Sequence, residues 1–156
     1  MAQSNIKKIQ EIIGEFFGKT GIIVEDIEIK TPQDSTIPIN LKMEDPQVLI
    51  GEGGQTLMDV QRLLKLVLQK KIASDARFYI DLDINDYKKK KTDYLKEMAK
   101  SAADEVSLIK KEKYLPPMSA YDRRVIHVEL AGRQDIITES VGFEPERMVA
   151  IKPRLL

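Results

Sequence analysis

The chain has 156 residues, with 25 Lys and Arg against 25 Asp and Glu, so its formal net charge is zero. A neutral total argues against a protein that coats nucleic acid or an anionic membrane by bulk charge. The chain has no Cys and a single His, which excludes disulfides, thiolate metal sites and multi-histidine metal sites. The charge is uneven, because residues 1–84 carry 10 basic and 13 acidic side chains, whereas residues 85–156 carry 15 and 12.

Hydrophobic residues make up 42% of the chain, enough to build a core and too many for a disordered protein. The first ten residues have lysines but no apolar segment of the kind found in secretory signals. The longest strongly apolar stretch, residues 63–68, is interrupted by Lys65, so we expect no membrane insertion. We therefore expect a cytoplasmic protein without a cofactor or a metal site.

The first half of the chain alternates between helical and strand periodicity. Its expected elements are a helix over 5–17, strands over 22–30 and 36–43, a short helix over 46–50, a long helix over 55–71 and a strand over 77–84. The two early strands are joined by a short polar link, which predicts a hairpin. Pro38 lacks a backbone N–H, so we expect the second strand at an edge of the sheet.

The second half has the longest helical pattern, over 86–113, which Pro116 and Pro117 end. Ser119 and Asp122 have the spacing of a capping box and predict a helix over 120–130. Strands follow over 136–143 and 148–154. The residues expected on the buried face of the long helix are Tyr87, Tyr94, Leu95, Met98, Ala102, Val106 and Ile109.

A glycine-rich loop separates the two middle helices of the first half. It runs Gly51, Glu52, Gly53, Gly54 and continues into Gln55. Glycines let a sugar-phosphate backbone lie close to the main chain, and the amides at the start of the next helix offer an anion site. A plain helix–helix turn would use the same glycines. The Glu52 carboxylate would repel a phosphate, so we expect weak or selective RNA binding by this loop.

The order helix–strand–strand–helix–helix–strand around this loop resembles that of the type II KH domain. The resemblance covers roughly residues 5–84, and residues 50–57 look like the KH signature loop. KH domains clamp about four nucleotides of single-stranded nucleic acid with a GXXG loop. The resemblance therefore implies that residues 51–55 contact RNA.

Arg123 and His127 are four residues apart, which places them on one face of the 120–130 helix. Arg offers a fork of donors to a phosphate, and His adds another donor or stacks on a base. An exposed pair on an amphipathic helix is the alternative. Lys152 and Arg154 share one face of the last strand and are further candidates for phosphate contact. The run 88–91 consists of four lysines, which cannot form a single stripe on a helix, so a solvated helix start is the better interpretation.

Residues 117–127 resemble the Arg-x-x-x-His domain, a small α/β binder of single-stranded nucleic acid, and residues 148–154 look like its last strand. The resemblance implies nucleic-acid contacts by Arg123, Arg124, His127, Lys152 and Arg154. A type II KH domain over 1–84 followed by this domain over 85–156 is an α+β arrangement similar to the bacterial Jag or SpoIIIJ-associated family. Many relatives have a further N-terminal domain that we do not expect in this chain.

Three hypotheses follow. The leading one is a non-enzymatic regulator that binds single-stranded RNA, with single-stranded DNA as an alternative ligand. The second is an interaction scaffold whose KH surface forms a homodimer, or a heterodimer with a small KH protein. The Jag resemblance implies such a partner, together with a role in RNA regulation and cell elongation. The third is an enzyme that uses His127 as acid or base; the sequence has neither a nucleophile elbow nor a metal cluster to support it.

Overall fold

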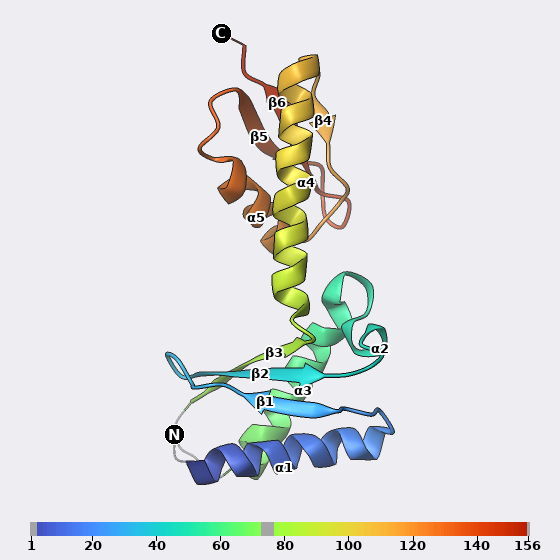
Figure 1. The fold of residues 1–156 in the computed structure, drawn as a ribbon, viewed down its shortest axis with the longest axis vertical. Coiled ribbons are helices and arrows are strands. Elements are labelled where there is room, and N and C mark those ends of the chain that lie inside the picture. The colour runs from blue at the N-terminus through green and yellow to red at the C-terminus, as the bar shows by residue number, and fades with distance from the viewer. Residues whose placement is uncertain (1–2, 73–76, 156) are drawn as a thin grey trace. The chain divides into compact units, whose positions relative to one another are not determined.

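The computed structural model describes residues 3–72 and 77–155. The chain divides into two compact units, Met1–Lys88 (unit 1) and Lys89–Leu156 (unit 2), each with helices and a three-stranded sheet (Figure 1). This arrangement confirms the expected mixed α and β composition. Among the described residues, no helix has an apolar run long enough to cross a bilayer.

Unit 1 follows the predicted order of helices and strands. Its elements are α1 (Gln3–Thr20), β1 (Asp26–Ile29), β2 (Thr36–Lys42), α2 (Gln47–Ile50), the one-turn 3-10 helix η1 (Glu52–Gly54), α3 (Gln55–Lys71) and β3 (Tyr79–Ile84). The glycine loop therefore lies between α2 and α3, as its position in the sequence predicts.

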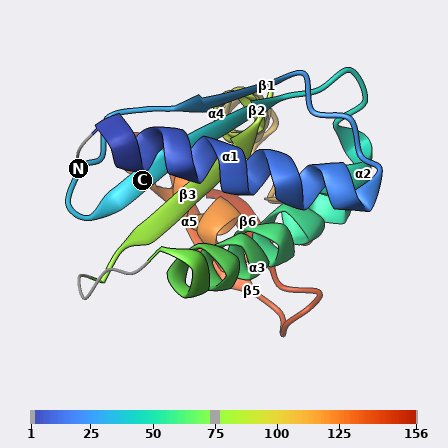
Figure 2. The ribbon, with the colours of Figure 1, turned by 90° about the horizontal axis from the view of Figure 1, so that it is seen from below.

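The sheet of unit 1 has the order β1-β2-β3, with β1 antiparallel and β3 parallel to β2. Alternating residues of β2 and β3 face inward, where α1 and α3 cover them (Figure 2). The fully buried side chains of this core are Ile9, Ile13, Ile37, Ile39, Leu41, Leu57, Leu64, Leu68, Leu82 and Ile84. The hairpin prediction is confirmed, and the hairpin's second strand continues into the glycine loop through α2.

The prediction that Pro38 marks an edge strand is wrong, because β2 is the central strand. The carbonyl of Pro38 accepts a hydrogen bond from the N–H of Lys30, one residue beyond the end of β1. The N and O of one strand residue point to the same side, so the missing N–H of Pro38 also faces β1, where that ladder stops. The proline therefore costs little pairing, although it lies in the middle of the sheet.

Unit 2 is formed by most of α4 (Tyr87–Ile109), β4 (Lys113–Tyr114), α5 (Ala120–Leu130), β5 (Ile136–Val141) and β6 (Met148–Pro153). Its sheet has the order β4-β6-β5 and is antiparallel throughout. Residues of α4 and α5 pack with one face of β5 and β6. The buried members of this core are Leu95, Ala99, Ala102, Ala103, Val106, Leu115, Ile126, Leu130, Ile136, Val149 and Ile151.

Three predictions for α4 are wrong. Tyr94 and Ile109 are 66% and 52% exposed rather than buried. The buried stripe runs through Leu95, and Tyr94 is rotated about 100° from it. The helix also ends at Ile109, since Lys110 takes a left-handed conformation with φ 62°, and the short strand β4 replaces the predicted last turn.

Candidate nucleic-acid interface

Two positions in the glycine loop of unit 1 need glycine because a side chain there would meet other residues of the same unit. Gly51 has φ 70° and ψ −176°, and a Cβ there would lie 2.1 Å from the Oγ1 of Thr56. Gly54 has φ 84°, and a Cβ there would lie 3.3 Å from the ring of Tyr87. Gly53, with φ 62°, has open space where its Cβ would be. The loop's shape thus requires Gly51 and Gly54 for packing, whereas Gly53 leaves the outer surface of the loop unobstructed.

Helix α3 begins directly after this loop, with Gly54 as its N-cap. The N–H of Gln55, its first residue, donates to the carbonyl of Glu52. The helix dipole places partial positive charge at this end of α3. Glu52 is exposed and lies three residues before Gln55, the first residue of α3. Its carboxylate therefore competes with an external anion for the positive end of the α3 dipole. The side-chain amide of Gln55 donates to Asp59 at 3.1 Å, so it is engaged within α3.

Helix α5 of unit 2 starts as the capping box predicts. The hydroxyl of Ser119 accepts a hydrogen bond from the N–H of Asp122 at 3.2 Å. The Asp122 carboxylate, whose side chain is 10% exposed, also pairs with the Lys91 ammonium at 3.0 Å, and this ties α5 to α4. The cap and this ion pair fix the start of the helix that carries the Arg-x-x-x-His motif.

Arg123 is buried, with 8% of its side chain exposed. Its Nη1 donates to the carbonyl of Met118 at 2.7 Å, and its Nη2 donates to the Oε1 of Glu144 at 2.9 Å. Glu144 lies on the loop between β5 and β6 and is 60% exposed at its side chain. In this structure the guanidinium therefore holds the β5–β6 loop against α5, and its two donors are directed at protein oxygens.

His127 is half-buried and lies one turn further along α5. Its Nδ1 and Nε2 are each 2.8 Å from a hydroxyl oxygen, that of Thr138 and that of Ser140, both on β5. In the neutral imidazole one nitrogen donates and the other accepts. Burial lowers the pKa of His127, and the positive charge of Arg123 lowers it further. The imidazole is therefore held neutral near pH 7 and connects α5 to β5.

A shallow pocket of about 740 Å³ opens beside this motif. Its charged lining comes from Arg123, Arg124 and Arg147, with Tyr121, His127 and Ser140 among its other residues. Arg124 is exposed, and its guanidinium forms no ion pair with the carboxylates that the structure describes. Arg147 immediately precedes β6 and donates to the carbonyl of Gly142 at 2.6 Å. The sequence analysis did not name Arg147 as a candidate site residue. Its basic side chain is visible in the sequence, but its position beside the pocket depends on the β5–β6 turn.

The structure does not bring Lys152 to this pocket. Residues paired across an antiparallel ladder share a face, and Lys152 pairs with Ile137, whereas Thr138 and Ser140, which contact His127, lie on the other face. The Lys152 ammonium binds the Glu139 carboxylate at 3.1 Å, and this hydrogen bond raises the pKa of Lys152. Arg154 follows β6 and is exposed. Of the ten predicted residues, five thus lie in the glycine loop of unit 1. In unit 2, Arg123, Arg124 and His127 line the pocket, whereas Lys152 and Arg154 do not.

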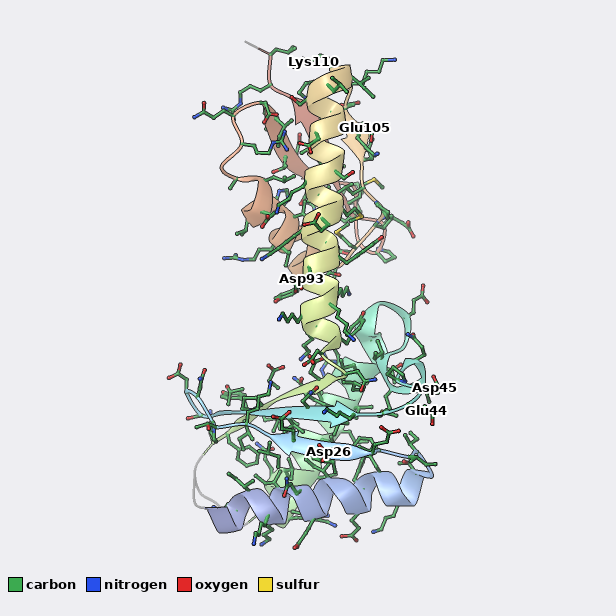
Figure 3. The ribbon with its side chains drawn as sticks, viewed as in Figure 1. Asp26, Glu44, Asp45, Asp93, Glu105 and Lys110 are labelled. Atoms are coloured by element: carbon green, nitrogen blue, oxygen red, sulfur yellow. The ribbon has the colours of Figure 1, made fainter. Side chains whose placement is uncertain are left out.

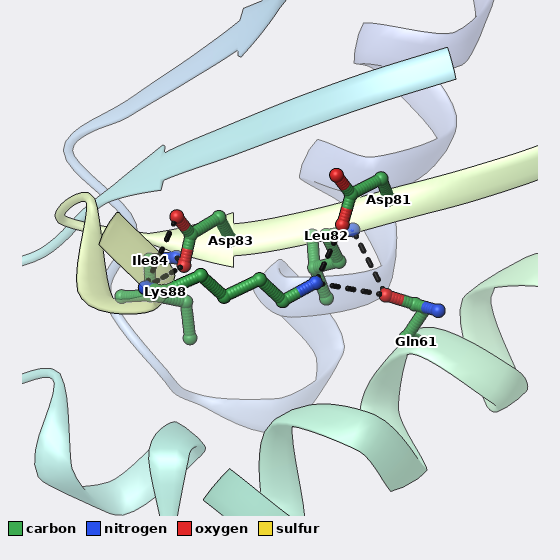
Figure 4. A network of polar contacts seen from close by, with 6 residues as sticks. All are labelled: Gln61, Asp81, Leu82, Asp83, Ile84 and Lys88. Atoms are coloured by element: carbon green, nitrogen blue, oxygen red, sulfur yellow. Dashed lines mark hydrogen bonds and ion pairs between the residues drawn. The ribbon is translucent and has the colours of Figure 1, made fainter. Parts of the chain in front are cut away.

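The lysine run at the start of α4 is partly occupied by internal contacts. In unit 1 the Lys88 ammonium is 2.5 Å from the Asp81 carboxylate and 3.5 Å from the Oε1 of Gln61, while Asp83 accepts the backbone N–H of Lys88 (Figure 4). Lys91 pairs with Asp122 in unit 2, as described above. These contacts agree with the interpretation of the run as a helix start rather than a dedicated nucleic-acid patch.

A second, apolar groove of about 470 Å³ lies in unit 1 between the end of β2 and the loop after α1. Ile23 and Val48, which line it, are 82% and 62% exposed. Glu25, Glu44 and Asp45 also line the groove, and the last two lie on the loop between β2 and α2 (Figure 3). Among the described residues, no group of His, Asp or Glu has the geometry of a metal site.

Comparison with known proteins assigns the second unit to a class. Residues 93–153 match the family model of the Arg-x-x-x-His (R-3-H) domain, which covers α5, its motif and both strands around the pocket. Most of the chain also aligns with curated bacterial proteins named RNA-binding protein KhpB. These matches confirm the predicted resemblance to the Jag family.

The relatives differ in how much of their length the chain covers. It is 34% identical to the Clostridium symbiosum protein over 145 residues, which is 92% of this chain and 64% of that protein. It is 28% identical to the Bacillus subtilis protein over 145 residues, or 92% of this chain and 66% of the other. With the Lactiplantibacillus plantarum protein it shares 33% identity over 116 residues, or 74% and 35%. The chain therefore spans less than two thirds of the length of each of these three relatives.

Proposed function

We propose that the chain is a non-enzymatic RNA-binding regulator of the bacterial cytoplasm and that unit 2 provides its main phosphate contacts. The observation that carries the proposal is the pocket beside α5, where Arg124, His127 and Arg147 line one open surface. Arg124 is exposed and is therefore available to a phosphate without first leaving a buried partner. The name RNA-binding protein, carried by relatives that align over most of the chain, supports RNA as the ligand.

Unit 1 has a complementary role in this proposal. Its order of elements, α-β-β-α-α-β with a glycine loop between the second and third helices, supports a type II KH domain over residues 1–84, followed by the Arg-x-x-x-His domain over 85–156. The open space above Gly53 would admit a nucleic-acid backbone next to the N-terminal end of α3. Because Glu52 opposes a phosphate there, this loop would add selectivity more than affinity.

The test is fluorescence anisotropy of short single-stranded RNAs over a salt series. Arg124→Ala should weaken binding and reduce the slope of log K against log salt by about 0.7, the value for one lost phosphate contact on a single strand. Lys111→Ala removes another exposed charge, just beyond the C-terminal end of α4, and serves as the control. Lys152→Ala tests the far face of β6. The proposal fails if the wild-type chain shows no binding at low salt, or if Lys111→Ala matches Arg124→Ala.

The enzymatic alternative has one geometric argument in its favour. The Nε2 of His127 lies 2.8 Å from the Oγ of Ser140, a distance suited to a base and a nucleophile. The other ring nitrogen faces the hydroxyl of Thr138, and the described residues that line the pocket include no carboxylate to orient the imidazole as a base. Incubation with ATP and with RNA, followed by product analysis, would support an enzyme only if turnover disappeared in His127→Ala.

A protein-interaction function is the second candidate, and the apolar groove of unit 1 favours it. Exposed Ile23 and Val48 between Glu25, Glu44 and Asp45 suit an apolar segment with basic neighbours, such as one on a second KH protein or a second copy of the chain. Light scattering after size exclusion should then show a dimer for the wild type and a monomer for Ile23→Asp. A wild-type monomer would exclude self-association and leave a heterodimer to be tested with a purified small KH protein.

A further inference from the structure

The loop between β5 and β6 presents an aromatic ring to solvent. Phe143 is 88% exposed, at a position where the chain reverses between the two strands. Single exposed apolar side chains are common and by themselves carry no functional meaning. The position of this one is informative because both of its chain neighbours contact arginines that line the pocket beside α5.

Four contacts hold this loop. The carbonyl of Gly142 accepts from Arg147, and the carboxylate of Glu144 accepts from buried Arg123. The N–H of Glu146 donates to the carbonyl of Phe143 at 2.8 Å, which closes a turn, and the N–H of Met118 donates to the carbonyl of Arg147 at 3.1 Å. The backbone on both sides of Phe143 is therefore fixed at the rim of the pocket, while its ring makes no contribution to the core of unit 2.

We propose that Phe143 is a stacking platform for an unpaired nucleobase of the strand whose phosphates lie in the pocket. An exposed aromatic ring beside cationic side chains is the arrangement by which proteins hold single strands, because the backbone follows the charges and a base covers the ring. Stacking needs only the π face of a base, so this contact would favour unpaired over paired RNA without reading its sequence. The proposal rests on the proposed function and adds a base-binding subsite to its phosphate contacts.

Arg123 gains a role from this arrangement. Its guanidinium is buried and bound to Met118 and Glu144, so in this structure it acts as a positioning residue that holds the loop carrying Phe143. A residue that contacted only phosphate would affect the salt slope of binding. A residue that positions Phe143 would affect base-dependent binding as well, which makes the two roles distinguishable.

The test compares two fluorescein-labelled probes of equal length, a short oligoadenylate and an abasic strand with the same phosphates, on the full chain. Phe143→Ala should weaken binding of the oligoadenylate by about five- to 150-fold, the range for one lost base stack, and leave binding of the abasic strand unchanged. The salt slope should not change, because no phosphate contact is removed. Leu108→Ala, which removes an apolar side chain that is 84% exposed on α4, is the matched control and should have no effect.

A second variant gives a direct signal. The chain has no Trp, so Phe143→Trp introduces a single indole, whose fluorescence should be quenched by the oligoadenylate and not by the abasic strand. If the wild type binds the oligoadenylate and Phe143→Ala binds it equally well, the stacking proposal is overturned while the proposed function stands. If the wild type binds neither probe, the proposed function fails, and this proposal fails with it.

Discussion

Gly51→Ala tests the account of the glycine loop most directly. Gly51 has φ 70° and ψ −176°, a backbone region that side chains rarely adopt, at a cost of about 1–3 kcal/mol. A Cβ at this position would also lie 2.1 Å from the Oγ1 and 2.7 Å from the Cβ of Thr56. Relief of that overlap by moving α3 would cost a further ~1–3 kcal/mol, as overpacking does in a core. We therefore expect a loss in the free energy of unfolding on the order of 2–6 kcal/mol.

Two further glycines provide matched controls for this variant. Gly53→Ala imposes a left-handed residue in open space and should cost about 1–2 kcal/mol. Gly18→Ala fills a position in α1 with no neighbour within 4 Å, and should stabilise unit 1 by roughly 0.5–1 kcal/mol. Adding Thr56→Ala to Gly51→Ala should recover part of the loss, because the closest contact disappears while the backbone strain remains.

Urea denaturation followed through the methyl NMR signals of Leu57 and Leu64, which are buried in unit 1, reports this unit separately from unit 2. From most to least stable, the predicted order is Gly18→Ala, wild type, Gly53→Ala and Gly51→Ala. If Gly51→Ala were as stable as Gly53→Ala, the overlap with Thr56 would not be what requires glycine at this position, and the reasoning would be refuted. Gly53→Ala has a second use, since a loss of RNA affinity larger than its loss of stability would indicate a ligand close to the loop.

Three other predictions concern the charges and caps described above. Glu52→Gln should raise RNA affinity by up to about fivefold at low salt, because it removes roughly 1 kcal/mol of repulsion from a phosphate at the start of α3. An unchanged anisotropy titration would place the phosphates in unit 2 alone. The single His signal in a ¹H–¹³C NMR titration should report a pKa below 6.5. Because the unfolded chain then binds a proton more readily than the folded one, the stability of unit 2 should fall as the pH drops below 6.5, and His127→Gln should remove that dependence. Ser119→Ala should lower the stability of unit 2 by about 1 kcal/mol in thermal or urea denaturation, and no change would mean that the hydrogen bond to Asp122 does not stabilise the helix start.

Local signals predicted most of the secondary structure. The capping box at Ser119 gave the start of α5, and the spacing of glycines gave the loop before α3, because each depends on neighbouring residues only. Position within a sheet was harder to predict. Pro38 was expected at an edge because the sequence does not show where β1 ends, and β4 was missed because it exists only through its pairing with Ile151 and Ala150 of β6. Non-local pairing decided both cases.

The pattern of burial explains why the candidate site was only partly predictable. Arg123 and Arg124 are adjacent and chemically identical in the sequence, yet Arg123 is buried against Glu144 while Arg124 is exposed at the pocket. Helical spacing places Arg123 and His127 on one face but does not say whether that face meets solvent or β5. Arg147 and Phe143 depend on the β5–β6 turn, whose geometry is fixed by contacts with α5. A sequence pattern can therefore locate the motif without identifying which of its cations are available.

These contacts give the Arg-x-x-x-His motif a structural function that precedes any ligand. Arg123 fixes the β5–β6 loop, and His127 fixes β5 through two hydroxyls, so each residue orders an element that lines the pocket. Of the cations that remain at its surface, Arg147 is then held in place before a strand arrives, which lowers the entropic cost of binding, while Arg124 stays exposed. The count of 15 basic side chains in residues 85–156 overstates how many cations a ligand meets, since Lys91 and Lys152 are paired with carboxylates. Binding by unit 2 should accordingly depend on a few positioned arginines rather than on total charge.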